Sequence, residues 1–183
     1  VLGFVSAVIW PTSITRVLSI KSSDLVNLQG VLQENGPSKD TRQALAFYER
    51  AMELDKENIA PKLNKANILL KQERLYEAEK LLLSIEKDSP LQLKMLTLLG
   101  SVYQRLGKTQ KAKKYWQQAV TLSSFDTASR FNLALLYWTE LDSYERAFHL
   151  FHEVLNLSPK NSEIYLAAKH QIEAMSVAQI KVR

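Results

Sequence analysis

The sequence has no cysteine and only five glycines and five prolines among its 183 residues. The absence of cysteine excludes disulfides, thiolate chemistry and zinc sites with thiolate ligands. It does not identify a cellular compartment, because cytosolic and periplasmic proteins can both lack cysteine. So few glycines and prolines are typical of a mostly helical chain with short turns.

Motifs of catalysis are also missing. No glycine-rich phosphate loop follows a predicted strand, and no spacing argues for a Ser-His-Asp arrangement. His149 and His152 lie three residues apart, a spacing that metal ligands use on helices, but no third histidine or cysteine lies near them in the sequence. We therefore expect a protein that is not an enzyme and that has no catalytic residue, no cofactor and no metal.

The charge balance is mildly basic, with a net charge of +5. Such a surface favours an acidic peptide or an anionic membrane, but its charge is too dispersed to predict nucleic-acid binding. The densest cluster of cations is Lys108, Lys111, Lys113 and Lys114. We interpret this cluster as a solvated convex face, with contact to anionic lipid or nucleic acid as the alternative.

The first ten residues, VLGFVSAVIW, carry no charge, and the apolar run stops at Pro11. It is too short to span a bilayer alone, which takes about 20 apolar residues. Three interpretations stay open for the segment 1–23: the end of a transmembrane helix, the apolar core of a signal peptide, or a segment that packs on the following domain. The first two predict membrane association through residues 1–20 or a periplasmic location, and the third a cytoplasmic one.

The rest of the chain repeats itself. Small residues recur at separations of 34, 34 and 35, at Ala44, Ala78, Ala112 and Ala147. Four residues after each comes a large apolar side chain: Tyr48, Leu82, Trp116 and Phe151. A second series, Ala66, Gly100 and Ala134, has the same period of 34. Offsets of three and four place such residues on one face of a helix, so each unit reads as a pair of helices.

This pattern resembles the tetratricopeptide repeat family over residues 24–159. The third unit, LTLLGSVYQRLGKTQKAKKYWQQAVTLS, is the best copy, and the first unit is the least regular because its NGPSKD turn is longer than usual. The resemblance implies an all-α, right-handed superhelical solenoid of antiparallel helix hairpins. Four repeats would fill residues 24–159, and residues 160–183 would form a capping helix and tail.

Helix boundaries follow from this register and from local signals. Helices are expected near 24–35, 39–55, 58–71, 75–87, 91–105, 109–122, 126–139, 143–157 and 161–178. Asp24 and Ser38 are the expected N-caps of the first two helices. Gly107 is expected to adopt a left-handed conformation in the turn of the third unit.

In this family the first helices of the hairpins line a concave groove that binds a peptide or helix of a partner protein. The resemblance places eleven residues there: Asn64, Asn67, Lys71, Lys94, Thr97, Ser101, Arg105, Phe131, Asn132, Leu135 and Trp138. Asparagine amides can bond an extended backbone, and the cations can hold a carboxylate. Phe131 and Trp138 either form an anchor pocket or pack between helices.

Family members that bind the acidic tails of heat-shock chaperones use a clamp of Lys and Asn, then Asn, then Lys and Arg across three hairpins. The matching positions here are Asn27, Val31, Asn64, Lys94 and Leu98. Only Asn64 and Lys94 fit, so we do not expect a clamp of this kind.

The expected function is therefore a non-catalytic scaffold for protein–protein interaction. Two alternatives stay open. One is the soluble part of a membrane-tethered assembly factor for an envelope, pilus or cytochrome system, which rests on the apolar start. The other is a regulatory helical domain of a larger enzyme, which rests on a first residue, Val1, that is not methionine. The sequence does not predict the oligomeric state or name the partner.

Overall fold

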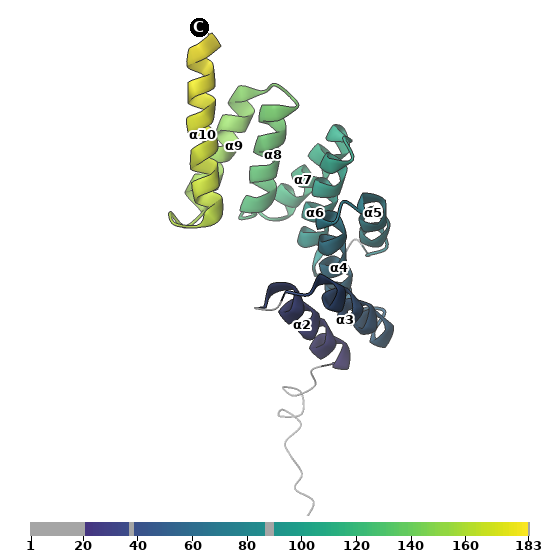
Figure 1. The fold of residues 1–183 in the computed structure, drawn as a ribbon. Coiled ribbons are helices and arrows are strands. Elements are labelled where there is room, and N and C mark those ends of the chain that lie inside the picture. Colours follow the sequence, from purple (N-terminus) through teal and green to yellow (C-terminus); the bar gives the residue numbers. More distant parts are fainter. Residues whose placement is uncertain (1–20, 37–38, 87–89, 183) are drawn as a thin grey trace, which may run out of the picture. The chain divides into compact units, whose positions relative to one another are not determined.

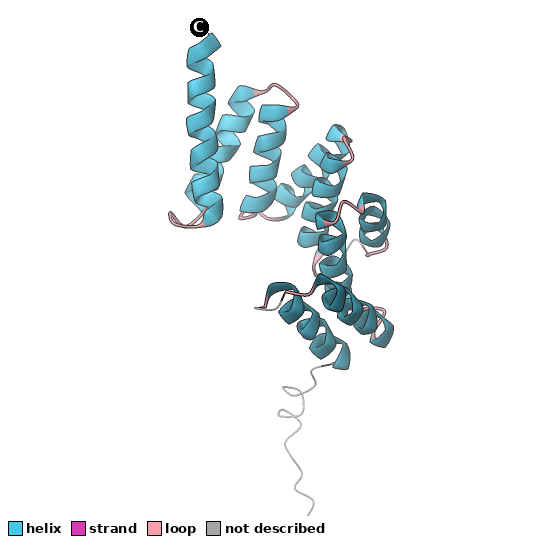
Figure 2. Cartoon of the chain, in the orientation of Figure 1, coloured by secondary structure: helices cyan, strands magenta, loops and turns pink. Residues whose placement is uncertain are grey.

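The computed structural model describes residues 21–36, 39–86 and 90–182. This part of the chain contains nine α-helices and no strand (Figures 1 and 2). The helices are α2 (Ser22–Asn35), α3 (Thr41–Leu54), α4 (Ile59–Lys71), α5 (Leu75–Leu83), α6 (Gln92–Arg105), α7 (Thr109–Leu122), α8 (Thr127–Thr139), α9 (Tyr144–Leu157) and α10 (Glu163–Val182). The predicted all-α solenoid of helix hairpins is confirmed as the fold class.

The prediction of a membrane or signal segment concerns residues 1–20, which lie outside the described residues. Among the helices that are described, none combines the length and the apolar character needed to cross a bilayer. Membrane association through the first residues stays a prediction.

The chain divides into two units, residues 1–61 and 62–183. In the first unit, α2 packs against α3 through Gly30 and Tyr48, whose ring is fully buried. The Tyr48 hydroxyl donates a hydrogen bond of 3.0 Å to the Glu34 carboxylate. Burial, together with this carboxylate, raises the pKa of Tyr48.

Both predicted N-caps are wrong. Asp24 lies inside the first turn of α2, and its carboxylate accepts a hydrogen bond of 2.7 Å from the Asn58 amide. Ser38 lies outside the described residues, and α3 begins two residues later than expected, at Thr41. Its cap is Asp40, whose carboxylate accepts hydrogen bonds from the backbone amides of Arg42 and Gln43.

In the second unit the repeated positions form the core. Ala78, Ala112 and Ala147 are fully buried. The large side chains four residues after each, Leu82, Trp116 and Phe151, are at most 3% exposed. Within this unit α6 packs on α7, α8 on α9, and α10 on α9. Small residues at the helix crossings let the large ones fill the space between neighbouring helices.

Two glycines in the third hairpin confirm the reading of the repeat. Gly107 has a φ of +67° in the turn between α6 and α7, the left-handed conformation predicted for it. Gly100 lies under the indole of Trp116, where a β-carbon would come within 2.3 Å of the ring nitrogen. The indole N–H in turn donates a hydrogen bond of 3.1 Å to the Thr97 carbonyl.

One helix is shorter than expected. The repeat pattern predicts a helix over 75–87, but α5 ends at Leu83. The amides of Ser84 and Ile85 bond to the carbonyls three residues back, at Leu81 and Leu82, which tightens the last turn and ends the helix.

Candidate functional site

The predicted groove residues lie on three first helices of the second unit, α4, α6 and α8. Two side-chain hydrogen bonds join these helices side by side. The Lys94 ammonium on α6 donates to the Asn64 carbonyl oxygen on α4 over 3.0 Å. The hydroxyl oxygens of Thr97 on α6 and Ser129 on α8 lie 2.9 Å apart. We call the surface formed by the eleven predicted residues the first-helix face.

The part of the first-helix face on α4 and α6 is polar. Asn64 and Asn67 are half-buried, while Lys71, Lys94 and Arg105 are exposed. Arg105 forms an ion pair with Glu73, which follows the end of α4. The structure therefore brings together the amides and cations that the sequence assigns to this surface, and it fixes two of the cations through partners on the neighbouring hairpin.

The hydroxyls of Thr97 and Ser101 are turned toward their own helix. Thr97 donates to the Leu93 carbonyl over 3.0 Å, and Ser101 donates to the Thr97 carbonyl over 3.1 Å. Such back-bonding satisfies the hydroxyl within the helix. The hydroxyls of these two residues are therefore already bonded within the protein.

The aromatic residues on α8 pack against α9. The Phe131 and Phe151 rings meet edge to face with centroids 5.5 Å apart, and Trp138 meets Tyr144 in the same way at 6.0 Å. Phe131 and Trp138 are nevertheless only half-buried, as are Asn132 and Leu135. Each ring therefore serves the packing of the hairpin with one edge and keeps part of its surface accessible.

Sequence reasoning missed a partly buried ion pair next to this face. The Arg130 side chain, on a residue only 8% exposed, donates to the Glu153 carboxylate over 3.0 Å and to the Asp126 carbonyl over 3.0 Å. Glu153 also lies 3.3 Å from the His149 imidazole. The partners are 23 residues apart on different helices, so no local spacing announces them.

The two histidines on α9, His149 and His152, contact residues of the same helix. His149 pairs with Glu153, and the His152 ring lies against Phe148 with centroids 4.5 Å apart. In the described ranges no group of three or more His, Cys, Asp or Glu side chains is arranged to hold a metal ion. Both histidines are exposed on α9, and each contacts a neighbour one turn away on the same helix.

The lysine cluster at the start of α7 lies on tyrosine rings. Lys108 is 5.7 Å from the ring centre of Tyr76, and both Lys108 and Lys111 lie over Tyr103. Lys113 lies over Tyr137 at 5.3 Å. Burial and the carboxylate of Glu79 raise the pKa of Tyr103, which makes its hydroxyl a poor proton donor to solvent. The tyrosine rings thus stabilise the lysine cations through cation–π contacts.

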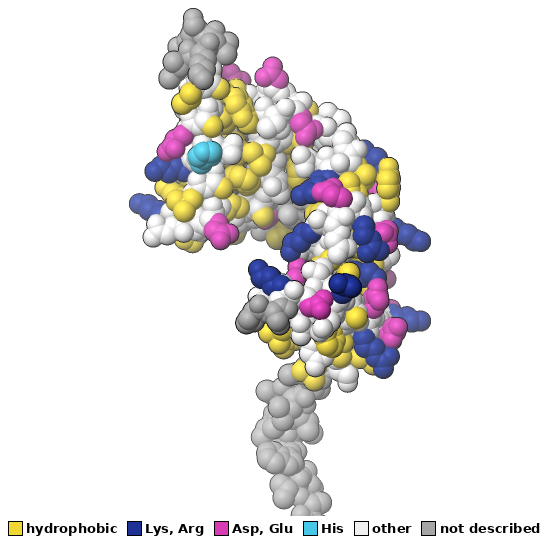
Figure 3. Space-filling model, viewed as in Figure 1, with side chains coloured by type: hydrophobic (Ala, Val, Ile, Leu, Met, Phe, Trp, Pro, Cys, Tyr) yellow, Lys and Arg dark blue, Asp and Glu magenta, His cyan; other side chains and the backbone are white. Residues whose placement is uncertain are grey.

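Figure 3 shows the surface from one side. On that side the dark blue Lys and Arg side chains stand out over α5–α7, while yellow apolar side chains are visible along α8–α10. On this side the cations are therefore more prominent over α5–α7 and the apolar side chains over α8–α10.

These hairpins, repeating every 34 or 35 residues, define a helical repeat protein of the solenoid class. Two sequence patterns described as tetratricopeptide repeat match the chain, over residues 38–102 and 93–126. The chain belongs to the tetratricopeptide repeat proteins, which are in general non-catalytic scaffolds for protein interaction.

Among curated proteins, the chain is similar to the protein STIP1 homolog of Dictyostelium discoideum, with 34% identity over 89 residues. The match covers 45% of this chain and 16% of that protein, so the chain spans about a sixth of the length of this relative.

Solved structures share the fold. The structure of pilF from Pseudomonas aeruginosa matches with a TM-score of 0.68 and 21% identity, covering 86% of this chain and 72% of that one. MamA from Desulfovibrio magneticus RS-1 gives 0.62 and 20%, covering 74% and 75%. YrrB, described as a TPR protein with an unusual peptide-binding site, gives 0.59 and 21%, covering 91% and 84%. At these identities the likeness shows the fold alone.

Proposed function

We propose that the chain is a scaffold that binds a peptide or helix of a partner protein along the first-helix face. The observation that carries this proposal is the hydrogen bond between Lys94 and Asn64, which places an ammonium and an amide from two hairpins at one point of the surface. An ammonium has three donors, and only one of them is needed for the Asn64 oxygen. The pair is therefore suited to hold a carboxylate or a backbone carbonyl of a bound segment.

The aromatic residues on α8 add an apolar contact area to the polar contact at Lys94 and Asn64. Half-buried rings that are held by a neighbouring helix lose little entropy when a ligand covers them, which is the property of interface anchors. Trp138, held against Tyr144, has this character. A partner segment with an acidic or polar portion and one large apolar residue would use both ends.

The test begins with a pull-down and mass spectrometry to identify a partner, followed by calorimetry with the partner segment. The double variant Asn64→Ala with Lys94→Ala, and separately Trp138→Ala, should each weaken binding about tenfold, equivalent to about 1.4 kcal/mol. Lys160→Ala is the control, because Lys160 is exposed and lies between α9 and α10, outside the face. Unchanged affinity in both test variants for every identified partner would show that this assignment is wrong.

A further inference from the structure

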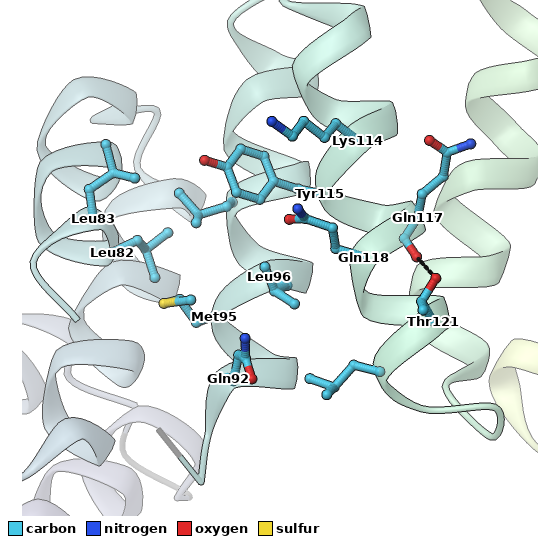
Figure 4. A pocket seen from close by; sticks show the side chains of 12 residues that line it. Leu82, Leu83, Gln92, Met95, Leu96, Lys114, Tyr115, Gln117, Gln118 and Thr121 are labelled. Atoms are coloured by element: carbon cyan, nitrogen blue, oxygen red, sulfur yellow. Dashed lines mark hydrogen bonds between the residues drawn. The ribbon is translucent and has the colours of Figure 1, made fainter. Parts of the chain in front are cut away.

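A hollow of about 710 Å³ opens between α5, α6 and α7 on a part of the second unit that shares no residue with the first-helix face. We call it the α5–α7 groove. Its floor is apolar and comes from Leu82, Met95, Leu96 and Leu99. Figure 4 shows Leu82 and Leu83 on one side, Met95 and Leu96 below, and Tyr115 and Gln118 on the other side.

The groove borders a short helix, α5. It has 9 residues, whereas the corresponding helices α7 and α9 have 14 each. The helix ends at Leu83, which lines the groove together with Met95, Leu96 and Leu99 of α6. At the rim, Leu83 and Leu122 are 55% and 51% exposed. Apolar floor and apolar rim together make a surface that gains free energy when a partner covers it.

The wall on α7 is straight and regular. It is formed by Lys114, Gln117, Gln118, Thr121 and Leu122, which follow one another at helical spacing on one face. At 1.5 Å per residue this wall is about 12 Å long, or a little over two turns of helix. A slot of this length, with an apolar floor and amide groups along one side, fits the apolar stripe of a short helix.

The charged residues around the α5–α7 groove favour an acidic partner. On α7 and at its N-cap the cations are Lys108, Lys111, Lys113 and Lys114, and this helix has no carboxylate. On α5, Glu77 and Glu79 stand beside Lys80. Lys114 lines the groove itself. A helix with acidic residues beside its apolar stripe would place a carboxylate near Lys114, whereas a basic helix would place a second cation there.

We propose that the α5–α7 groove is a second docking surface, and that it takes an acidic amphipathic helix of a partner protein. This helix lies along the α7 wall and covers the apolar floor that α6 supplies. The two surfaces use different residues, so one chain can hold two partner segments, and a failure of one assignment leaves the other intact.

The three methionines make a direct test practical. Met95 lies in the groove floor, while Met52 belongs to α3 and Met175 to α10. With ¹³C-methyl methionine in the full chain, each methyl signal reports one site. The probe is a 16-residue synthetic helix with leucines along one stripe and glutamates beside it, and its matched control has lysine at every glutamate.

The acidic helix should shift the Met95 signal saturably and leave Met52 and Met175 in place. The lysine version should bind at least fivefold more weakly. Leu122→Arg should abolish the shift, because it puts a long charged side chain at the rim. Leu157→Arg is the matched control, since Leu157 stands 35 residues later at the same place in α9, is 37% exposed and does not line the groove.

Charge is tested separately with Lys114→Glu, which should weaken the acidic helix at least threefold. The same change at Lys113, which does not line the groove, should have less than half that effect. Both variants are read at physiological salt, where charges farther than about 8 Å are largely screened.

Four outcomes would overturn the proposal. The first is no Met95 shift at millimolar peptide, and the second is equal binding of the acidic and lysine helices. The third is a Met95 shift that depends on protein concentration without peptide, which would mean that a second copy covers the groove. The fourth is tighter binding of monomeric laurate than of the helix, which would make the groove an acyl-chain site.

Discussion

Trp116 and Gly100 fit together so closely that only a hydrogen is tolerated on the α-carbon of residue 100. A β-carbon there would lie 2.3 to 2.7 Å from three atoms of the indole. The ring cannot easily turn away, because its N–H is bound to the Thr97 carbonyl. The packing of α6 on α7 in the third hairpin therefore requires a residue without a β-carbon at position 100.

The first prediction follows from this contact. Gly100→Ala should lower the free energy of unfolding by about 1–3 kcal/mol, because it overpacks the crossing of α6 and α7. Urea denaturation followed by circular dichroism measures it. Ser101→Ala, one residue along the same helix, is the control and should change stability by less than about 0.5 kcal/mol. Combining Gly100→Ala with Trp116→Leu should cost less than the sum of the two single changes. Simple additivity would mean that the two residues do not clash.

The second prediction concerns the ion pair of Arg130 and Glu153. Arg130→Ala should lower the free energy of unfolding by about 1–3 kcal/mol, because it leaves Glu153 and the Asp126 carbonyl without their donor. Because the Glu153 side chain is 37% exposed, water partly replaces the lost donor, and the expected loss of stability lies toward the lower end of this range.

The control for this pair is Arg50→Ala. Arg50 pairs with Glu53 over 2.9 Å, but both side chains are more than 60% exposed. Removing it should cost no more than about 1 kcal/mol. Equal losses in the two variants would show that burial adds nothing to the Arg130 pair.

Much of the fold could be predicted because the buried core residues recur every 34 or 35 residues along the sequence. Alanines at 44, 78, 112 and 147 are all fully buried, as a repeat of one crossing requires. Most helix ends fall within two residues of their expected places for the same reason. These features depend on residues near one another in the sequence, or one repeat apart.

What could not be predicted depends on contacts with no period. The sequence after Leu83 has no glycine or proline before Pro90, so nothing marks the early end of α5. Serine is a favoured N-cap residue, which points to Ser38, but Asp40 caps α3. On the first-helix face, the residues could be listed from the repeat, while the bond between Lys94 and Asn64 needed the structure.

The third prediction uses Asp40. Hydrogen bonds from the amides of Gln43 and Arg42 lower the pKa of this carboxyl below its usual 3.8. A lowered pKa in the folded state means that the charged carboxylate stabilises the fold above pH 3.8, and that this contribution is lost as the pH falls through the folded value. Asp40→Ala should therefore lower the melting temperature at pH 7, and the gap to the wild type should narrow below pH 3.8.

Asp40→Asn separates charge from capping. An asparagine side chain caps a helix about as well but does not titrate. Its melting temperature should stay near that of the wild type at pH 7 and rise above it in acid. A gap between wild type and Asp40→Ala that stays constant from pH 7 to pH 2 would contradict the role assigned to this carboxylate.

The last prediction separates binding from stability at Lys94. This residue is exposed, and its bond to Asn64 joins two side chains at the surface, so Lys94→Ala should change the free energy of unfolding by less than about 0.5 kcal/mol. If the ammonium meets a carboxylate of the partner, the affinity of the wild type should fall as sodium chloride rises from 50 to 300 mM, because salt screens the exposed pair. The variant should bind more weakly at low salt and lose less affinity over the same range. Calorimetry at several salt concentrations measures both slopes. Parallel slopes for the two proteins would mean that Lys94 does not contact charge on the partner, even if the variant binds more weakly.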